Sequence, residues 1–331
     1  MEQMQLKFSI VIPCLNEEKY IGNCIDSILN QSYDTSLIEI IVVDGGSTDK
    51  TPEILSDYLK KISGLKIFHN SEKVTPRALN IGIKNATGEV VVILGAHTRI
   101  DPEFISLNNK FLTERNIKVS GGTQINEGKT FRQKLIGIVM GLPFGISSAS
   151  YRWSKKEQFV DTVVYAAYKK EIFEEIGYFE EKFSISEDAE INWRIRQKGY
   201  KIFYSPQIKT YYYPRTQIIG FLKQLFRYGI LRVNVVKKHP DALKFVHLIP
   251  SIFVLVILGL AALLPISIVS LKILIFIVCI HVLISLVTSF KYLKSDQFRF
   301  LFFIPILIFL MHFFWGLGFL IGFILPKSNK W

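Results

Sequence analysis

Three long apolar runs in the last third of the chain constrain its fold more than any other feature. They read FVHLIPSIFVLVILGLAALLPISIV, LKILIFIVCIHVLISLVTSF and FLFFIPILIFLMHFFWGLGFLIGFIL, with almost no charged residue. About 20 apolar residues in a helix cross the roughly 30 Å hydrocarbon core of a bilayer. We therefore expect an all-α membrane region over 245–331, with transmembrane helices at about 246–269, 271–290 and 300–325. A buried helical bundle in a soluble protein is the alternative.

Basic residues beside these runs predict their orientation. One cluster precedes the first run and another separates the second from the third: Lys237, Lys238, Lys244, Lys291, Lys294 and Arg299. Because positive residues favour the cytoplasmic side, both clusters place the N-terminal part in the cytoplasm; Lys327 and Lys330 in the tail oppose this orientation. The N-terminus does not have the pattern of a signal peptide. We expect an integral protein of the cell membrane with a cytoplasmic N-terminal domain.

The net charge of +12 also limits the class of partner. It favours an anionic membrane surface and phosphate-bearing substrates. No basic-aromatic module accompanies it, so we expect no nucleic-acid partner. Cys14, Cys24 and Cys279 lack the spacing of a metal site or a disulfide, as expected in a reducing compartment.

The part before the membrane region alternates short apolar runs with helical patterns. The runs FSIVIPCL, IEIIVVDGG, LKIFHN and EVVVILGA each precede or follow a stretch with helical spacing. This alternation predicts βαβ units and a Rossmann-like, mostly parallel sheet in an α/β domain over 1–214. Ligands of such sheets bind beyond the carboxyl ends of the strands. The polar or small residues at these ends are Asn16, Glu17, Asp44, Gly45, Gly46 and His97.

Residues 215–244 form a separate segment between the two regions. The stretch RTQIIGFLKQLFRYGILRVNVVKKH mixes apolar and basic residues at helical spacing. This pattern predicts an amphipathic helix at the membrane surface, with an ordinary surface helix as the alternative.

The stretch DGGSTD follows the second predicted strand. Its aspartate, Asp44, can accept hydrogen bonds from a base or a ribose, and Gly46 lets the backbone approach a ligand closely. By itself the stretch is equally compatible with a strand-to-helix turn capped by Ser47. Asn16 and Glu17 follow the first predicted strand and are expected at the same sheet edge as Asp44, which favours a binding site.

Four stretches together resemble a known enzyme family. FSIVIPCLNEEKYI, IEIIVVDGGSTDKT, ALNIGIKNATGEVVVIL and GYFEEKFSISEDAEINWRIRQKGYKI are similar, in order and spacing, to family 2 glycosyltransferases of the GT-A fold. The resemblance is strongest to the membrane-anchored glucosyltransferases of succinoglycan biosynthesis. It implies an inverting enzyme with a nucleotide-diphosphate sugar donor, more specifically a UDP-sugar. It also implies that Asp44 lies near the base, with Pro13, Asn16 and Glu17 lining its pocket.

The stretch SEDAEINWRIRQKGY carries the expected catalytic base. Asp188 begins a predicted helix, whose N-terminal end favours a carboxylate, so the residues alone are compatible with a helix cap. The resemblance implies that Asp188 deprotonates the acceptor hydroxyl, with Glu187 beside it in the substrate site. Glu190 is expected to pair with Arg194, four residues further on.

The stretch QLFRYG resembles the Gln-x-x-Arg-Trp motif of processive polysaccharide synthases, with tyrosine replacing tryptophan. Gln224, Arg227 and Tyr228 are thus candidates for substrate binding, since a guanidinium suits a diphosphate and an aromatic ring can stack on a sugar. The alternative for Arg227 is a side chain that reaches lipid headgroups. Three spans are few for a polymer channel, so we expect transfer of a single sugar.

The family's metal site is where the sequence departs from the pattern. The family has Asp-x-Asp after the fourth strand, and this chain has Gly95-Ala96-His97. His97 is therefore the candidate ligand of a divalent cation, Mn²⁺ or Mg²⁺, or a direct contact of the diphosphate; a structural histidine is the alternative. Gly95 provides only room. Asp101 is expected in a turn or helix cap, and Arg77 and Arg99 could neutralise the diphosphate without a metal.

The sequence thus predicts transfer of a sugar to a lipid-linked saccharide at the cytoplasmic membrane face, for polysaccharide or glycoconjugate synthesis. Direct transfer to a polyprenyl phosphate is one alternative. The other is a non-catalytic membrane module that binds nucleotide sugars.

Overall fold

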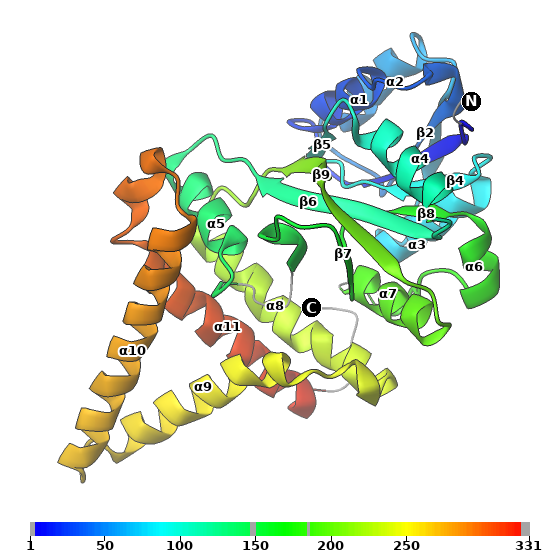
Figure 1. Cartoon of the computed structure of the whole chain (residues 1–331). Coiled ribbons are helices and arrows are strands. Elements are labelled where there is room, and N and C mark those ends of the chain that lie inside the picture. Colours follow the sequence, from blue (N-terminus) through cyan, green and yellow to red (C-terminus); the bar gives the residue numbers. More distant parts are fainter. Residues whose placement is uncertain (1–3, 146–149, 184–185, 326–331) are drawn as a thin grey trace. The chain divides into compact units, whose positions relative to one another are not determined.

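The computed structural model describes residues 4–145, 150–183 and 186–325. The chain forms two compact units (Figure 1). The first comprises Met1–Ile125 and Ser154–Tyr212, and the second comprises Asn126–Trp153 and Tyr213–Trp331. The chain passes from the first unit to the second for the last time after Tyr212, close to the border expected near residue 214. The segment Asn126–Trp153, expected within the first domain, packs instead in the second unit.

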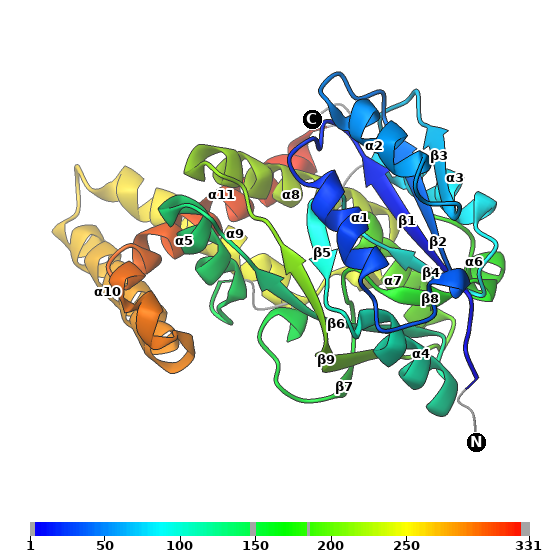
Figure 2. The ribbon, with the colours of Figure 1, turned by 90° about the horizontal axis from the view of Figure 1, so that it is seen from above.

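The first unit is built on one mixed sheet with the strand order β3-β2-β1-β4-β8-β6-β9-β5, and β7 pairs with β9. Strands β3, β2, β1 and β4 are parallel (Figure 2), as the βαβ pattern predicts. The other pairings described, β4 with β8, β6 with β8, β9 with β5 and β9 with β7, are antiparallel. The strands are β1 (Phe8–Cys14), β2 (Ile38–Asp44), β3 (Leu65–His69), β4 (Val90–Ile93), β5 (Thr98–Ile100), β6 (Val119–Asn126), β7 (Gln158–Val160), β8 (Ala167–Lys169) and β9 (Ile202–Tyr212).

Helices cover the parallel strands, which explains why β1, β2 and β4 are mostly apolar. Helix α1 packs on α2, and α3 packs on β1, β2 and β3. Strands β1 and β4 pair from Phe8 with Val90 to Val11 with Ile93, so the loops after them begin at the same sheet edge. The helices of this unit are α1 (Ile21–Leu29), α2 (Thr51–Leu59), α3 (Thr75–Asn85), α4 (Phe104–Glu114), α6 (Glu171–Ile176) and α7 (Glu187–Gln197), with the 3₁₀ helix η1 (Thr35–Leu37).

A buried carboxylate connects β1, β2 and β3 near their N-terminal ends, at the sheet edge opposite to the loops that follow the strands. Glu39, near the start of β2, accepts hydrogen bonds from the Ser9 hydroxyl and from the backbone of Thr87, and it pairs with Lys66 at 3.0 Å. Burial raises the pKa of Glu39, but these hydrogen bonds outweigh burial and hold it at about 2. These contacts of Glu39 therefore stabilise the folded state at every pH at which its carboxylate is ionised.

The second unit is helical and contains the three apolar runs. Its helices α9 (Phe245–Leu263), α10 (Ile268–Tyr292) and α11 (Ile304–Ile324) are long and apolar enough to cross a membrane. The other elements are α5 (Phe131–Gly141), α8 (Ile218–Lys238) and the 3₁₀ helices η2 (Ser150–Arg152), η3 (Pro240–Ala242) and η4 (Ser295–Phe300). The fold class expected from the sequence, an α/β domain followed by an apolar helical region, is confirmed.

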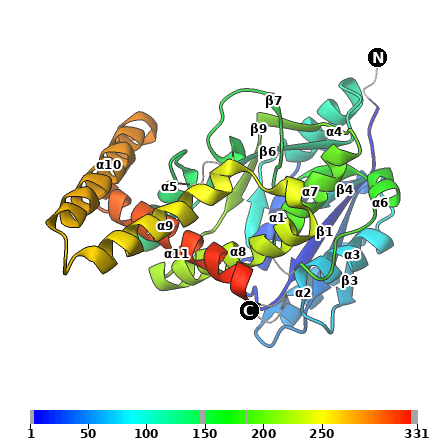
Figure 3. The ribbon, with the colours of Figure 1, turned by 90° about the horizontal axis from the view of Figure 1, so that it is seen from below.

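Glycines set the contact between α8 and α11, which lie side by side (Figure 3). A Cβ atom on Gly318 would lie 2.1 Å from the carbonyl oxygen of Phe226, and one on Gly322 would lie 2.7 Å from that of Ile230. Gly229 of α8 faces the backbone of Trp315 in the same way, at 2.3 Å. Small residues allow this close approach of two helices. One side of α8 is thus buried against α11.

Candidate active site

The loops after β1 and β2 are held together by backbone and side-chain hydrogen bonds. Asn16 has a left-handed backbone, with a φ of 56°, which asparagine tolerates better than most residues. Its backbone N–H donates to the Ser47 hydroxyl at 2.8 Å, and its Oδ1 accepts from the Thr48 N–H at 2.8 Å. The Glu17 N–H donates to the Thr51 hydroxyl at 2.8 Å. These contacts place the predicted site residues of both loops at one edge of the sheet.

Asp44 ends β2 and organises the loop that follows it. Its carboxylate accepts hydrogen bonds from the Ser47 hydroxyl at 2.5 Å, the Ser47 N–H at 3.1 Å and the Gly46 N–H at 3.2 Å. Gly46 has a φ of 79°, a conformation that glycine adopts easily. Pro13 lies opposite Val43 in the parallel register of β1 and β2. The predicted contact of Asp44 with a base therefore has to share the carboxylate with its own loop.

Glu17 does not stand alone at this edge, because it contacts His97 from the loop after β4. The Nδ1 atom of His97 lies 2.8 Å from Oε1 of Glu17. The imidazole is also near two tyrosine rings, with centroid distances of 6.5 Å to Tyr20 and 5.2 Å to Tyr212. A carboxylate on Nδ1 fixes the tautomer and the direction of the imidazole ring.

The space beside Gly95 is bordered by Tyr165, a residue that the sequence did not single out. A Cβ atom on Gly95 would lie 3.4 Å from Cε1 of Tyr165 and 3.4 Å from the hydroxyl oxygen of Thr98. Tyr165 has a φ of 52°, which is rare for a bulky residue and is found most often at functional sites. The Thr98 hydroxyl is buried and has no hydrogen-bond partner within residues 4–145, 150–183 and 186–325. A side chain at position 95 would thus contact the ring of Tyr165 and the hydroxyl of Thr98 from its Cβ atom onward.

Asp188 and Glu187 lie at the N-terminal end of α7. Ser186, just before the helix, has a left-handed backbone with a φ of 69°. The Asp188 carboxylate accepts a hydrogen bond from the Ala189 N–H at 2.7 Å. Burial, followed by the charge of Asp188, raises the pKa of Glu187 above its ordinary value. A carboxyl group with a strongly raised pKa is a feature common at functional sites.

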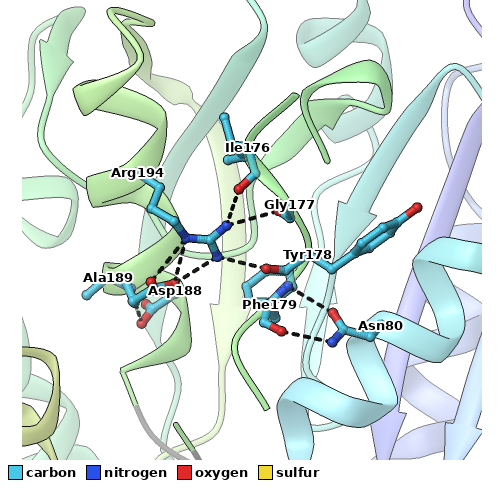
Figure 4. Close-up of polar contacts among 9 residues, drawn as sticks. Asn80, Ile176, Gly177, Tyr178, Phe179, Asp188, Ala189 and Arg194 are labelled. Atoms are coloured by element: carbon cyan, nitrogen blue, oxygen red, sulfur yellow. Dashed lines mark hydrogen bonds and ion pairs between the residues drawn. The ribbon is translucent and has the colours of Figure 1, made fainter. Parts of the chain in front are cut away.

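An arginine holds the start of α7 to the turn after α6 (Figure 4). Arg194 pairs with the buried Glu190 at 2.8 Å, as the spacing predicted. Its guanidinium also donates to the carbonyl oxygens of Ile176 at 2.6 Å, Gly177 at 3.0 Å and Tyr178 at 2.8 Å. These contacts fix the first turns of α7 and with them the position of Asp188.

Two of the predicted cations have partners within the protein. Arg77 pairs with Glu181 at 3.0 Å and with Glu72 at 3.2 Å, so its charge is matched by carboxylates. The guanidinium of Arg99 lies 3.7 Å from the centroid of the Tyr211 ring. The Tyr211 hydroxyl donates to Asp101 at 2.9 Å, and Asp101 also accepts from the Glu103 N–H at 3.4 Å, in keeping with a turn before α4.

Gln224, Arg227 and Tyr228 belong to the second unit and lie on α8. The Gln224 side-chain amide donates to the Tyr228 hydroxyl at 2.7 Å, across one helical turn. Arg227 and Tyr228 are exposed, whereas the next residue, Gly229, is buried against α11. The predicted motif therefore forms one solvent-facing patch on α8.

Comparisons with known proteins decide the family. The family model described as "Glycosyl transferase family 2" matches residues 9–177. The chain belongs to this family. The match includes the loops after β1, β2 and β4, so it contains Asn16, Asp44 and His97. The chain is thus a family 2 glycosyltransferase, as the motifs predicted.

Relatives of this family 2 glycosyltransferase cover both of its units. A Methanococcus voltae protein named dolichyl N-acetyl-alpha-D-glucosaminyl phosphate 3-beta-D-2,3-diacetamido-2,3-dideoxy-beta-D-glucuronosyltransferase is 31% identical over 97% of this chain and 98% of its own length. The succinoglycan biosynthesis protein ExoA of Rhizobium meliloti is 27% identical over 70% of each chain. The similarity to a protein of the succinoglycan type confirms the resemblance seen in the motifs.

A solved structure supports the fold at lower sequence identity. The mannosyltransferase PcManGT from Pyrobaculum calidifontis, solved with GDP-Man and Mn²⁺, has a TM-score of 0.66 and 18% identity. The match covers 93% of this chain and 86% of that one. It confirms the GT-A fold of the family 2 glycosyltransferase.

Proposed function

We propose that this family 2 glycosyltransferase moves a sugar, with inversion, from a nucleotide-diphosphate donor to a lipid-linked saccharide, as part of polysaccharide or glycoconjugate synthesis. The similarity along 97% of the chain to a relative named for transfer to dolichyl N-acetylglucosaminyl phosphate carries this proposal. The three apolar helices are consistent with an acceptor that resides in a membrane. We further propose that the enzyme is in the cell membrane, with its first unit on the cytoplasmic face.

The donor's nucleoside is assigned to the loops after β1 and β2. Asn16, Asp44 and Gly46 lie at the carboxyl ends of parallel strands, where ligands of such sheets bind. Pro13 lines the same edge. A uracil base, and hence a UDP-sugar, is the favoured donor from the resemblance of these motifs.

Asp188 is proposed as the general base for the acceptor hydroxyl. Its place at the N-terminal end of α7 stabilises a carboxylate, and the Arg194 contacts hold that end in position. Glu187, whose pKa is raised, is proposed to hold a proton beside it and so limit the local negative charge.

The residues at the position of the family's Asp-x-Asp motif fit a cation that both the protein and the donor's diphosphate would bind. Within the described ranges, no group of three or more His, Cys, Asp or Glu side chains could hold a metal ion alone. His97, oriented by Glu17, has Nε2 as the ring nitrogen for a cation, and the carboxylate–histidine arrangement is typical of metal ligands. Imidazole favours Mn²⁺ over Mg²⁺. A bound cation would neutralise charge on the leaving diphosphate.

Arg227 is proposed as the cation that meets the leaving diphosphate, with Tyr228 as a stacking surface for a sugar. Gln224 orients Tyr228 through the 2.7 Å hydrogen bond on α8.

Donor competition in membranes tests the proposed function. Membranes that contain the full chain are incubated with labelled UDP-sugars and GDP-sugars and with an extract of lipid-linked saccharides, each with Mn²⁺ or with EDTA. We expect transfer of label to the lipid fraction from a UDP-sugar and a lower rate in EDTA. Absence of transfer from every donor would contradict the enzymatic function.

A further inference from the structure

A polar cavity lies in the second unit, and its lining includes none of the residues assigned to the donor. Its volume is about 360 Å³, and its walls come from the loop before α5, from α5 and from η4. The side chains that define its chemistry are Glu127, Lys129, Lys134, Tyr213, Asp296 and Arg299. None of them belongs to a motif of the proposed transferase reaction.

The cavity is lined by three cations and two carboxylates, so its lining carries a net positive charge. Lys129, Lys134 and Arg299 form no ion pair within the described part of the chain. Lys129 and Arg299 instead lie near aromatic rings, at 5.9 Å from the Tyr213 centroid and 5.0 Å from the Phe300 centroid. Such cations remain available for an anionic ligand.

The cavity lies at one end of the apolar helices. The 3₁₀ helix η4 connects the end of α10 at Tyr292 with the start of α11 at Ile304. Exposed aromatic side chains flank it: Phe131, Phe298, Phe302 and Phe303. Aromatic residues gather at the headgroup level of a bilayer. A ligand of this cavity therefore meets the protein at the membrane–water interface.

The wall on the α5 side is built by packing and capping. Phe131, the first residue of α5, contacts the rings of Phe300 at 4.7 Å and Phe303 at 5.4 Å. Thr130 caps α5 through a capping box with Gln133. A Cβ atom on Gly128 would lie 2.4 Å from the backbone nitrogen of Lys134. The loop therefore lies tightly against the first turn of α5, which presents Lys129 and Lys134 on a fixed backbone.

We propose that this cavity binds the phosphodiester headgroup of an anionic bilayer glycerolipid. Lys129, Lys134 and Arg299 meet the phosphate, and the carboxylates of Glu127 and Asp296 accept hydrogen bonds from headgroup hydroxyls. The carboxylates distinguish this ligand from a bare phosphate, because they add acceptors that only a hydroxylated headgroup can use. The bound lipid fixes the level at which η4 and α5 sit in the bilayer.

The experiment uses the full chain in phosphatidylcholine nanodiscs. Phosphatidylglycerol, undecaprenyl phosphate or inorganic phosphate is titrated, and retained ligand is measured by native mass spectrometry. The test variant is Lys129→Gln with Lys134→Gln. The control variant is Lys291→Gln with Lys294→Gln, which removes an equal charge from the segment just before η4 without altering the cavity lining.

We expect wild type to retain phosphatidylglycerol, and the test variant to bind it at least about 30-fold more weakly, since each cavity lysine loses a charge-assisted hydrogen bond to the phosphate. The control variant should change binding by less than about threefold, because exposed charges outside the cavity are screened. Asp296→Asn should bind phosphatidylglycerol several-fold more tightly, since it removes a negative charge but keeps a hydrogen-bond acceptor; a misfolded variant cannot show this gain.

Three results would overturn the proposal. Equal losses in the test and control variants would mean that the cavity adds nothing beyond general surface charge. Preferential retention of undecaprenyl phosphate would assign the cavity to an isoprenoid lipid instead. Binding of inorganic phosphate with the affinity of the lipid would show that the headgroup hydroxyls and the bilayer make no contribution.

Discussion

Glu17 and His97, eighty residues apart in the sequence, meet at 2.8 Å between Oε1 and Nδ1. One follows β1 and the other follows β4, and the parallel pairing of these strands starts both loops at the same edge. The carboxylate that the motif pattern assigns to the nucleoside pocket is therefore also the partner of the imidazole that replaces an aspartate.

Glu17→Gln should weaken the response to Mn²⁺. The amide keeps the size of the side chain but loses the charge that orients His97, and loss of such a partner typically costs 10–100-fold in metal affinity. The measurement is Mn²⁺ binding in the presence of UDP, followed by electron paramagnetic resonance, together with the Mn²⁺ dependence of transfer. Glu53→Gln, an exposed carboxylate on α2, is the control. An unchanged Mn²⁺ affinity in Glu17→Gln would leave the pair with a purely structural role.

Gly95→Asp should not restore an ordinary Asp-x-His site, because its carboxylate has to fit beside Tyr165 and Thr98, which a Cβ atom at this position already contacts at 3.4 Å. We expect the substitution to destabilise the first unit by about 1–3 kcal/mol, as overpacking does. Adding Tyr165→Ala should relieve much of this loss, since the two side chains compete for one volume. Thermal unfolding of the two single variants and the double variant measures the coupling. Strictly additive effects would show that the ring and the new carboxylate do not meet.

Asp188→Asn should abolish transfer while leaving donor binding intact. Loss of a general base removes about 10²–10⁴-fold in rate when the acceptor is a sugar hydroxyl. A polyprenyl phosphate acceptor is already ionised, so substantial activity in Asp188→Asn would favour that rival acceptor. Initial rates and UDP-sugar affinity are measured side by side. Glu174→Gln, an exposed carboxylate on α6, is the matched control.

The free energy of unfolding should fall in acid because Glu39 becomes protonated. Its folded-state pKa of about 2 lies below the ordinary value of 4.5, so the stabilisation is present above pH 4.5 and is lost as the pH falls toward 2. The shift corresponds to about 3 kcal/mol. Thermal unfolding of the solubilised chain at pH 7, 4.5 and 3 should show a steeper loss for wild type than for Glu39→Gln. Parallel curves for the two proteins would contradict this assignment.

The sequence predicted the elements with strong local patterns. The apolar runs identified β1, β2 and β4 as well as α9, α10 and α11, because burial on both faces or in lipid leaves a continuous hydrophobic signal. The Glu190–Arg194 pair was predictable for the same reason, since four residues is one helical turn.

Contacts between distant segments were not predictable from local patterns. Nothing in the sequence around Gly95 indicates that Tyr165 lies beside it, since the two residues meet only through the pairing of β4 with β8. Likewise, Arg77 was expected to be available for a diphosphate, and Glu181, which pairs with it, follows it by more than a hundred residues. The carbonyl oxygens that accept from Arg194 carry no side-chain signal at all.

The placement of Asn126–Trp153 in the second unit makes the two units inseparable by a single cut. The chain passes between them after Ile125, before Ser154 and after Tyr212. A protein shortened at Tyr212 would keep α5 but lose α8 and α11, the helices against which α5 packs. Its apolar face, with Leu135, Ile136 and Val139, would then face water. Exchange of the membrane helices between relatives by one crossover should therefore yield insoluble chimaeras unless residues 126–153 are exchanged with them.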